Sequence, residues 1–414
     1  MPAPARIGAA LLSAGLLAGL AAAPAVADSA SPSAAASAAS SAPAPVTPPA
    51  AVFGKGDPTY DGVWRQSLSL LALHSAKAAV PPAAVEWLTA QQCADGGWPS
   101  YQAGTGCTAG AEDSNATAVA VQALAALGGH QAAVAKGADW LKSVQNADGS
   151  WAYNPGNPGD ADSTGLALSA LTAAGVDPKT VAKSGKDGLA ALTALQLDCK
   201  ATADQRGGLQ YQPAADGAAP EANPLASAQS ALALAGGALP VAAGTAQPAA
   251  PKALDCAGVT AGEGAAAYLV GALGANGGHL MLSTPGAPAT PDYAATAWAA
   301  LSLAKAGYTA QAAPAVDWLS ANAGGWAKGK PATGTDAAAT ATLILAAEAN
   351  GRTPLSFAGT DLVAQLLAAG PAAPAPAKAA AKKSSQPNIF LMLGVGLAIG
   401  IGYGVFLSRR KRSQ

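Results

Sequence analysis

Charged residues are scarce in this chain of 414 residues: they make up 11% of the sequence, and the formal net charge is −1. A protein that binds nucleic acid needs a clustered basic surface. The only dense basic run, residues 409–412, lies at the extreme C-terminus. The composition therefore excludes a nucleic-acid partner.

Cysteine and histidine are also scarce, with four and three residues. The chain has no Cys-x-x-Cys pair, and its histidines lack the spacing of zinc ligands, so we predict no metal site. An even number of cysteines in an exported chain indicates two disulfides. A Cys93–Cys107 bond would close one loop and a Cys199–Cys256 bond would join two repeats, but the sequence leaves the connectivity open.

Long apolar runs occur only near the two ends of the chain. Residues 1–27 have the pattern of a secretory signal, with Arg6, an apolar run and small residues before the cleavage point. Residues 28–52 are rich in Ala, Ser and Pro and too poor in large apolar groups to fold, so we predict a disordered linker.

A second apolar run begins at Ile389 and ends at Leu407. As a helix it would cross a hydrocarbon core of about 30 Å, so we predict a transmembrane helix at 388–408. Residues 371–387 would form a Pro/Ala/Lys stalk, and the basic tail 409–414 would lie in the cytoplasm. We therefore expect a single-pass protein of the cell membrane, anchored by one helix, with its folded part, residues 53–370, outside the cell.

The folded part is built from internal repeats. Between them runs a degenerate Trp-Leu…Gln…Asp-Gly-Gly-Trp pattern, and an Asp or Asn opens each of six Ala-rich apolar stretches: Asp61, Asp113, Asp162, Asn223, Asp292 and Asp336. Asp and Asn are strong helix N-caps. A repeat unit cannot bury its apolar face alone, so neighbouring repeats must stack or close into a ring.

The repeats predict two kinds of helix. Helices that are apolar on nearly every side belong inside, and we expect them near 61–78, 113–127, 162–174, 223–236, 292–306 and 336–350. Helices with a single apolar stripe belong outside, and we expect them near 82–92, 132–146, 186–197, 261–274, 312–322 and 357–369. This alternation predicts an all-α fold, an (α/α)6 toroid.

Function is expected on one face of the toroid. The long loops all lead from an outer to an inner helix, so they gather on one face with the N-termini of the inner helices. We predict that a ligand binds there to aromatic side chains and capping acids: Trp98, Trp151, Tyr211, His279, Trp326, Asp113, Asp162, Asp292 and Asp336. As a cap beside the helix dipole, Asp162 should have a lowered pKa.

The Trp-Leu-x3-Gln-x3-Asp-Gly-Gly-Trp string at 87–98 and its variant at 140–151 resemble the repeats of squalene–hopene cyclases and protein prenyltransferases. The acid motif of the cyclases, Asp-x-Asp-Asp-Thr, is similar to residues 160–164, which have Ser163 in place of the last Asp. The resemblance implies that Asp162 would be the proton donor. The magnesium motif for diphosphates and the zinc triad of the prenyltransferases are absent.

The segment that begins at Asp162 is also similar to a helix of intrinsic factor and transcobalamin. Those proteins bind cobalamin without reaction, on a toroid completed by a β-rich domain. The resemblance implies cobalamin as a bound ligand and a separate β-rich domain or a membrane transporter as partner. No catalytic cofactor is implied.

These patterns favour ligand capture over catalysis. We expect an exported, membrane-anchored toroid that binds a bulky amphiphile, either corrinoid-like or isoprenoid, without converting it. The alternatives are a terpene cyclase or prenyltransferase-like enzyme in which Asp162 is the acid, and a toroidal enzyme that acts on glycans.

Overall fold

The computed structural model describes residues 48–56, 62–101, 107–108, 110–283 and 287–372. They all belong to one compact unit, which ends at Ala373. The predicted signal, membrane span and basic tail lie outside the described residues, as do Asp61, nearly all of the predicted stalk and most of the predicted linker. Within the described ranges, no helix combines the length and apolarity needed to cross a membrane.

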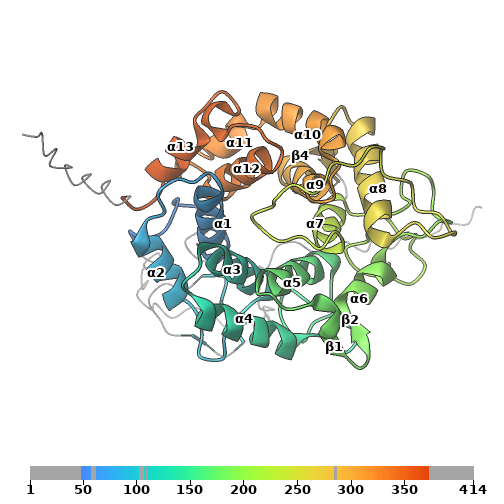
Figure 1. The fold of residues 1–414 in the computed structure, drawn as a ribbon, viewed down its shortest axis with the longest axis horizontal. Helices are drawn as coiled ribbons and strands as arrows, with labels where there is room; N and C mark the ends of the chain where they lie inside the picture. Colours follow the sequence, from blue (N-terminus) through green and yellow to red (C-terminus); the bar gives the residue numbers. More distant parts are fainter. Residues whose placement is uncertain (1–47, 57–61, 102–106, 109, 284–286, 373–414) are drawn as a thin grey trace, which may run out of the picture. The chain divides into compact units, whose positions relative to one another are not determined.

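The described chain is mostly helical, and six helices form an inner ring (Figure 1). Each inner helix packs against the next, and the last packs against the first, so the ring closes. Its members are α1 (Gly62–Ser75), α3 (Ser114–Leu127), α5 (Ala161–Ala173), α7 (Pro224–Leu234), α9 (Tyr293–Lys305) and α12 (Ala337–Ala349). The predicted α/α toroid is therefore present.

Each inner helix is followed by an outer helix that packs against it. The outer helices are α2 (Pro82–Ala90), α4 (Gln131–Val144), α6 (Gly188–Leu195), α8 (Ala261–Ala275), α10 (Thr309–Asn322) and α13 (Leu362–Ala368). The sequence patterns did not predict α11 (Gly324–Lys328), which lies in the last long loop, or the 3-10 turns η1 (Pro178–Thr180) and η2 (Pro354–Ser356).

Two small antiparallel ribbons decorate the ring. Strands β1 (Ala182–Lys183) and β2 (Lys186–Asp187) pair Ala182 with Asp187. Strands β3 (Leu280–Leu282) and β4 (Thr290–Asp292) pair Leu280 with Asp292, which places the second ribbon directly before α9.

The inner helices begin where a side-chain oxygen caps them. Asp113, Asn223, Asp292 and Asp336 each accept a hydrogen bond from the backbone N–H three residues later, at 2.6 to 2.9 Å. This replaces one of the hydrogen bonds that a helix N-terminus lacks. These four predicted caps are confirmed.

The predicted cap at Asp162 is wrong. Helix α5 is capped by Asp160, whose carboxylate accepts from the Ser163 N–H at 2.7 Å, and Asp162 lies inside the first turn. A repeated hydroxyl explains the register, because each cap is followed four residues later by Thr or Ser: Thr117, Thr164, Ser227, Thr296 and Thr340. Thr164 stands four residues after Asp160, so Asp160 occupies the cap position of the repeat and Asp162 is an additional acid.

These hydroxyls fasten the long loops to the inner helices. The Trp98 N–H donates to Thr117 Oγ1 at 2.9 Å, and the Trp151 N–H donates to Thr164 Oγ1 at 3.0 Å. Leu209 and Leu280 make the same contact with Ser227 and Thr296. Four of the long loops are thereby held over the N-terminus of the helix that follows each of them.

Two disulfides close further loops. Cys93 is bonded to Cys107 and Cys199 to Cys256, with Cα atoms 5.5 Å apart in each pair. The prediction of two disulfides is confirmed. At the joint between the ends of the toroid, Phe53 is fully buried, its N–H donates to Gln66 Oε1 at 3.0 Å, and the Gly54 N–H donates to the Ala369 carbonyl at 2.8 Å.

Candidate functional site

The N-terminal turn of α5 directs Asp162 toward the axis of the ring. Thr164 Oγ1 accepts a hydrogen bond from the Trp151 N–H, and the Trp151 indole donates to Leu141 of the outer helix α4. The side of α5 that carries Thr164 therefore faces outward. A side chain two residues earlier is rotated by about 200° around the helix. Gly165 faces α7, because a Cβ there would lie 3.1 Å from Ser230. Asp162 therefore points inward, on the face where the long loops gather.

Asp162 is partly exposed, yet its Oδ1 atom is buried and has no hydrogen-bond partner. Desolvation, together with the nearby carboxylates of Asp160 and Asp292, raises the pKa of Asp162 to about 7. The predicted lowering of this pKa is wrong, because burial outweighs any stabilisation of the carboxylate at the helix start; it also raises the pKa of the true caps Asp113 and Asp160, although they accept backbone hydrogen bonds. At neutral pH a large fraction of its carboxyl groups carries a proton.

The loop face also carries two units in which a tyrosine covers a capping acid. In the first, Ser100 Oγ donates to Asp113 Oδ2 and lies 3.0 Å from Tyr153 Oη. Burial raises the pKa of Asp113 to about 6, although hydrogen bonds from Ala116, Ser100 and Tyr153 oppose the increase. Asp113 is almost fully buried, so its carboxyl group belongs to the packing between repeats.

The second unit repeats this arrangement one helix further on. Ser163 Oγ donates to Asp160 Oδ2 at 2.9 Å, and Tyr211 hydrogen-bonds the same carboxyl group. Burial and the neighbouring acids Asp160 and Asp162 raise the pKa of Tyr211 to about 12. Tyr153 and Tyr211 are each 42% exposed, so both present an aromatic face to a ligand while their hydroxyls are engaged.

A cluster of four partly exposed rings lies on the other arc of the face. His279 stacks on Trp318 with centroids 4.4 Å apart, and Tyr293 lies 5.1 Å from Trp318 and 5.7 Å from Trp326. The structure thus brings together the predicted residues His279, Trp326 and Asp292, since Asp292 directly precedes Tyr293. Tyr293 and Trp318 were missing from the predicted site.

Trp98 and Trp151 do not lie on the surface of this face. Both are fully buried, and their indole N–H groups donate to the carbonyls of Leu88 and Leu141 at 2.8 and 2.7 Å. The Gly-Gly-Trp turn inserts each indole between an inner and an outer helix, where its large apolar area is buried. Neither ring is therefore available on the face that was predicted to bind a ligand. Asp336 is an exposed cap of α12.

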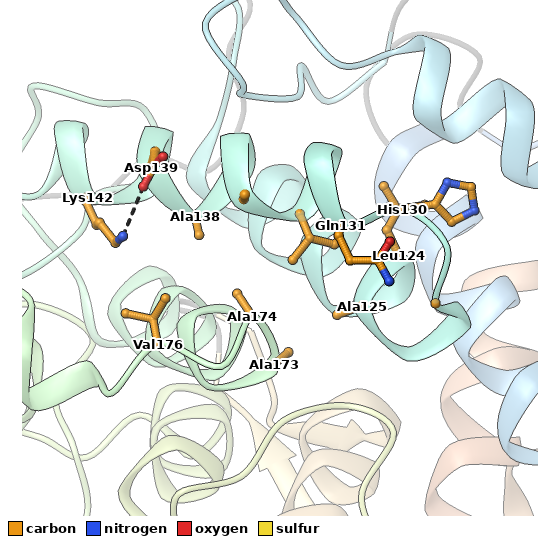
Figure 2. A pocket seen from close by; sticks show the side chains of 13 residues that line it. Leu124, Ala125, His130, Gln131, Ala138, Asp139, Lys142, Ala173, Ala174 and Val176 are labelled. Carbon is orange, nitrogen blue, oxygen red and sulfur yellow. Dashed lines mark hydrogen bonds and ion pairs between the residues drawn. The ribbon is translucent and has the colours of Figure 1, made fainter.

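One cavity lies away from this face. It has a volume of about 310 Å³ between α4 and the C-terminal ends of α3 and α5, and its lining includes Leu124, His130, Lys142 and Val176 (Figure 2). It contains none of the predicted site residues. Its only charged pair drawn in Figure 2, Lys142 and Asp139, is a surface contact of 3.0 Å.

Among the described residues, the acids of the loop face do not gather into a group close enough to share one ion. Within the described residues, one set of three His, Cys, Asp or Glu side chains places its ligand atoms within 4.8 Å of one another: Cys93, Cys107 and Glu112. The two sulfurs of that set are joined in a disulfide. The capping acids are further apart because each belongs to a different helix.

Comparison with known proteins supports the architecture. Residues 49–161 match the family model described as squalene-hopene cyclase C-terminal domain. No curated protein sequence matches the chain. Together with the closed ring, the family match supports a terpenoid cyclase/prenyltransferase-like α/α toroid, as the repeats predicted.

Two solved structures are similar over 70% of this chain, each with a TM-score of 0.43. A protein from Actinoplanes is 16% identical, with 92% of its length covered. An ent-copalyl diphosphate synthase from Streptomyces platensis is 18% identical, and this chain spans 50% of its length.

Proposed function

We propose that this toroid is an enzyme of the terpenoid cyclase type that starts its reaction by protonating an isoprenoid double bond, with Asp162 as the acid. The observation that carries the proposal is the position of Asp162. It faces the ring axis, its Oδ1 atom has no partner, and the repeat does not require an acid there. The matched squalene-hopene cyclase model supports the same reaction class.

The chemistry needs a carboxyl group that still holds its proton near neutral pH. A pKa of about 7 supplies this, because burial and two neighbouring acids disfavour the carboxylate. The Asp162 O–H bond would break as a C–H bond forms on one alkene carbon, leaving a cation on the other carbon. Ring closure moves this cation along the chain, and loss of a proton ends the reaction, so the net change is an isomerisation.

A buried indole faces the ring axis from α9. Trp298 follows the outward-facing Thr296 by two residues, so it faces the axis one turn deeper, where it is buried. An indole at this depth would offer a large apolar surface to an isoprenoid bound on the axis.

The test is turnover by the purified full-length chain, with squalene, prenyl alcohols and prenyl diphosphates as substrates and mass spectrometry of the products. We expect a cyclic isomer of one substrate, a rate that falls about tenfold per pH unit above pH 7, and a loss of about 10²-fold or more in Asp162→Asn. Asp336→Asn is the matched control, since it also removes an acid next to an inner helix. Equal rates in the two variants would rule out Asp162 as the acid.

Capture of an amphiphile without reaction is the second candidate. The partly exposed cluster of His279, Trp318, Tyr293 and Trp326 favours it, because stacked rings offer a large contact area to a corrinoid, an isoprenoid or a glycan. Under this alternative, ligands would quench tryptophan fluorescence without any product, and Asp162→Asn would bind as well as the parent chain.

A further inference from the structure

The electrostatic surroundings of Asp162 are entirely acidic. The charges that raise the pKa of Asp162 are those of Asp160 and Asp292. The pKa of Tyr153 is raised by the charge of Asp113, and that of Tyr211 by the charges of Asp160 and Asp162. The five loops that lead to α3, α5, α7, α9 and α12 contain eleven acidic and four basic residues. An anionic ligand would therefore be repelled from the face that holds the acid.

The four basic residues of these loops do not surround the acid. Lys200, Lys328 and Lys330 are not buried, and the guanidinium of Arg206 donates to the Ala201 carbonyl of its own loop at 3.2 Å. None of them acts on Asp162, whose charged neighbours are both carboxylates. A diphosphate bound at this face would lack the Lys or Arg partners that such groups need.

A metal bridge to a diphosphate is not prearranged either. Both carboxyl oxygens of Asp113 and both of Asp160 already accept hydrogen bonds from the protein. Asp292 uses Oδ1 to cap α9. These acids could bind a cation only if they gave up the contacts that start the inner helices.

A second oxygen without a partner lies at the equivalent position of the neighbouring helix. Asn115 follows the cap Asp113 by two residues, as Asp162 follows Asp160, and α3 packs against α5. Asn115 is partly exposed, and its Oδ1 atom is buried without a hydrogen bond. Since Thr117 faces the outer loop, Asn115 faces the axis beside Asp162.

A buried acceptor without a partner is costly, and a donor on the ligand removes that cost. We propose that the substrate is an uncharged isoprenoid alcohol whose hydroxyl donates to Asn115 Oδ1, and that prenyl diphosphates are excluded. This inference rests on the proposed function and adds the substrate class and a positioning residue to it. A hydroxyl is small enough to reach the first turn, and it adds no negative charge to the acidic face.

The test compares three probes with the same fifteen-carbon chain: farnesol, farnesyl methyl ether and farnesyl diphosphate. Binding to the full-length chain is followed by tryptophan fluorescence, so it does not depend on turnover. We expect farnesol to bind about tenfold more tightly than the diphosphate at low ionic strength. The ether should bind about fivefold more weakly than farnesol, because it lacks a donor for one neutral hydrogen bond.

Variants of Asn115 assign the contact. Asn115→Ala should weaken farnesol about fivefold and leave the ether unchanged, while Asn115→Gln, which keeps an amide oxygen, should recover part of the loss. Asp361→Asn, at the exposed cap of the outer helix α13, should change neither probe. Circular dichroism and the thermal midpoint identify any variant that fails to fold. In that case the comparison of farnesol with its methyl ether in the parent chain tests by itself whether a hydroxyl donor is recognised.

The outcomes separate this inference from the proposed function. If farnesol binds selectively but the chain converts no substrate to a cyclic product, the alcohol site is supported and the proposed cyclase activity is overturned. A diphosphate that binds as tightly as farnesol, with or without Mg²⁺, would overturn the alcohol site, even if it is cyclised in an Asp162-dependent reaction. Absence of farnesol binding at millimolar concentration would also overturn it.

Discussion

The first turns of α3 and α5 differ at one functional position. Both helices begin with a capping Asp, both carry a Thr four residues later, and both receive a buried Trp from the preceding loop. Two residues after the cap, however, α3 has Asn115 and α5 has Asp162. The shared residues build the repeat, so the change from Asn115 to Asp162 at the position that faces the axis separates the acid of the proposed reaction from the groups that every repeat needs.

The largest expected effect concerns a feature that the two repeats share. Trp98→Ala and Trp151→Ala should each lower the free energy of unfolding by about 3–5 kcal/mol, because each indole is fully buried and its N–H is bonded to a backbone carbonyl. Denaturant unfolding measures the loss. A loss below about 1 kcal/mol in either variant would contradict the assignment of these residues to the core.

The next prediction addresses the position that differs. The pKa of Asp162 is raised from 3.8 to about 7, so the folded state holds a proton that the unfolded state releases between these pH values. Stability therefore decreases as pH rises from about 4 to about 7. Asp162→Asn should remove this dependence and make the chain more stable above pH 7, by at most about 4 kcal/mol at about 1.4 kcal/mol per pH unit.

The reciprocal substitution sharpens this contrast. Asn115→Asp places a carboxylate where the amide oxygen already lacks a partner, so it should destabilise the chain above pH 7 and have little effect below pH 4. Thermal unfolding of both variants across this pH range provides the measurement. If stability changed with pH in the same way in both variants and in the parent chain, the absence of a hydrogen-bond partner for Asp162 Oδ1 and Asn115 Oδ1 would be contradicted.

Much of the fold could be predicted from the sequence, because capping residues and apolar periodicity are local signals. The six inner and six outer helices lie close to their predicted ranges. The cap of α5 is ambiguous from helix patterns alone because two acids stand two residues apart, and the signal that distinguishes Asp160 from Asp162 is the Asp-x3-Thr spacing shared with other repeats. Burial of Trp98 and exposure of Tyr153 depend on packing between repeats, which no local pattern contains.

A smaller effect is expected at the caps themselves. Asp113→Ala and Asp160→Ala should each cost about 1 kcal/mol, because each removes the acceptor for a backbone N–H at a helix start. The corresponding Asn variants should recover most of this energy, since Asn caps nearly as well. Asp162→Ala should show no capping loss. If Asp162→Ala were the most destabilising of the three Ala variants at pH 7, the register of α5 would be wrong.

The smallest effect tests whether the two tyrosine units are equivalent. Tyr153 hydrogen-bonds Asp113 and Tyr211 hydrogen-bonds Asp160, and in both cases the bond lowers the pKa of the carboxyl group against the dominant effect of burial. Tyr153→Phe should therefore raise the pKa of Asp113 above about 6, and Tyr211→Phe should raise that of Asp160. One neutral hydrogen bond contributes about 0.5–1.5 kcal/mol, so each increase should be at most about one pH unit. Carboxyl-carbon NMR titration would resolve both groups. An unchanged carboxyl pKa in either variant would contradict the hydrogen bond between tyrosine and capping acid in that unit.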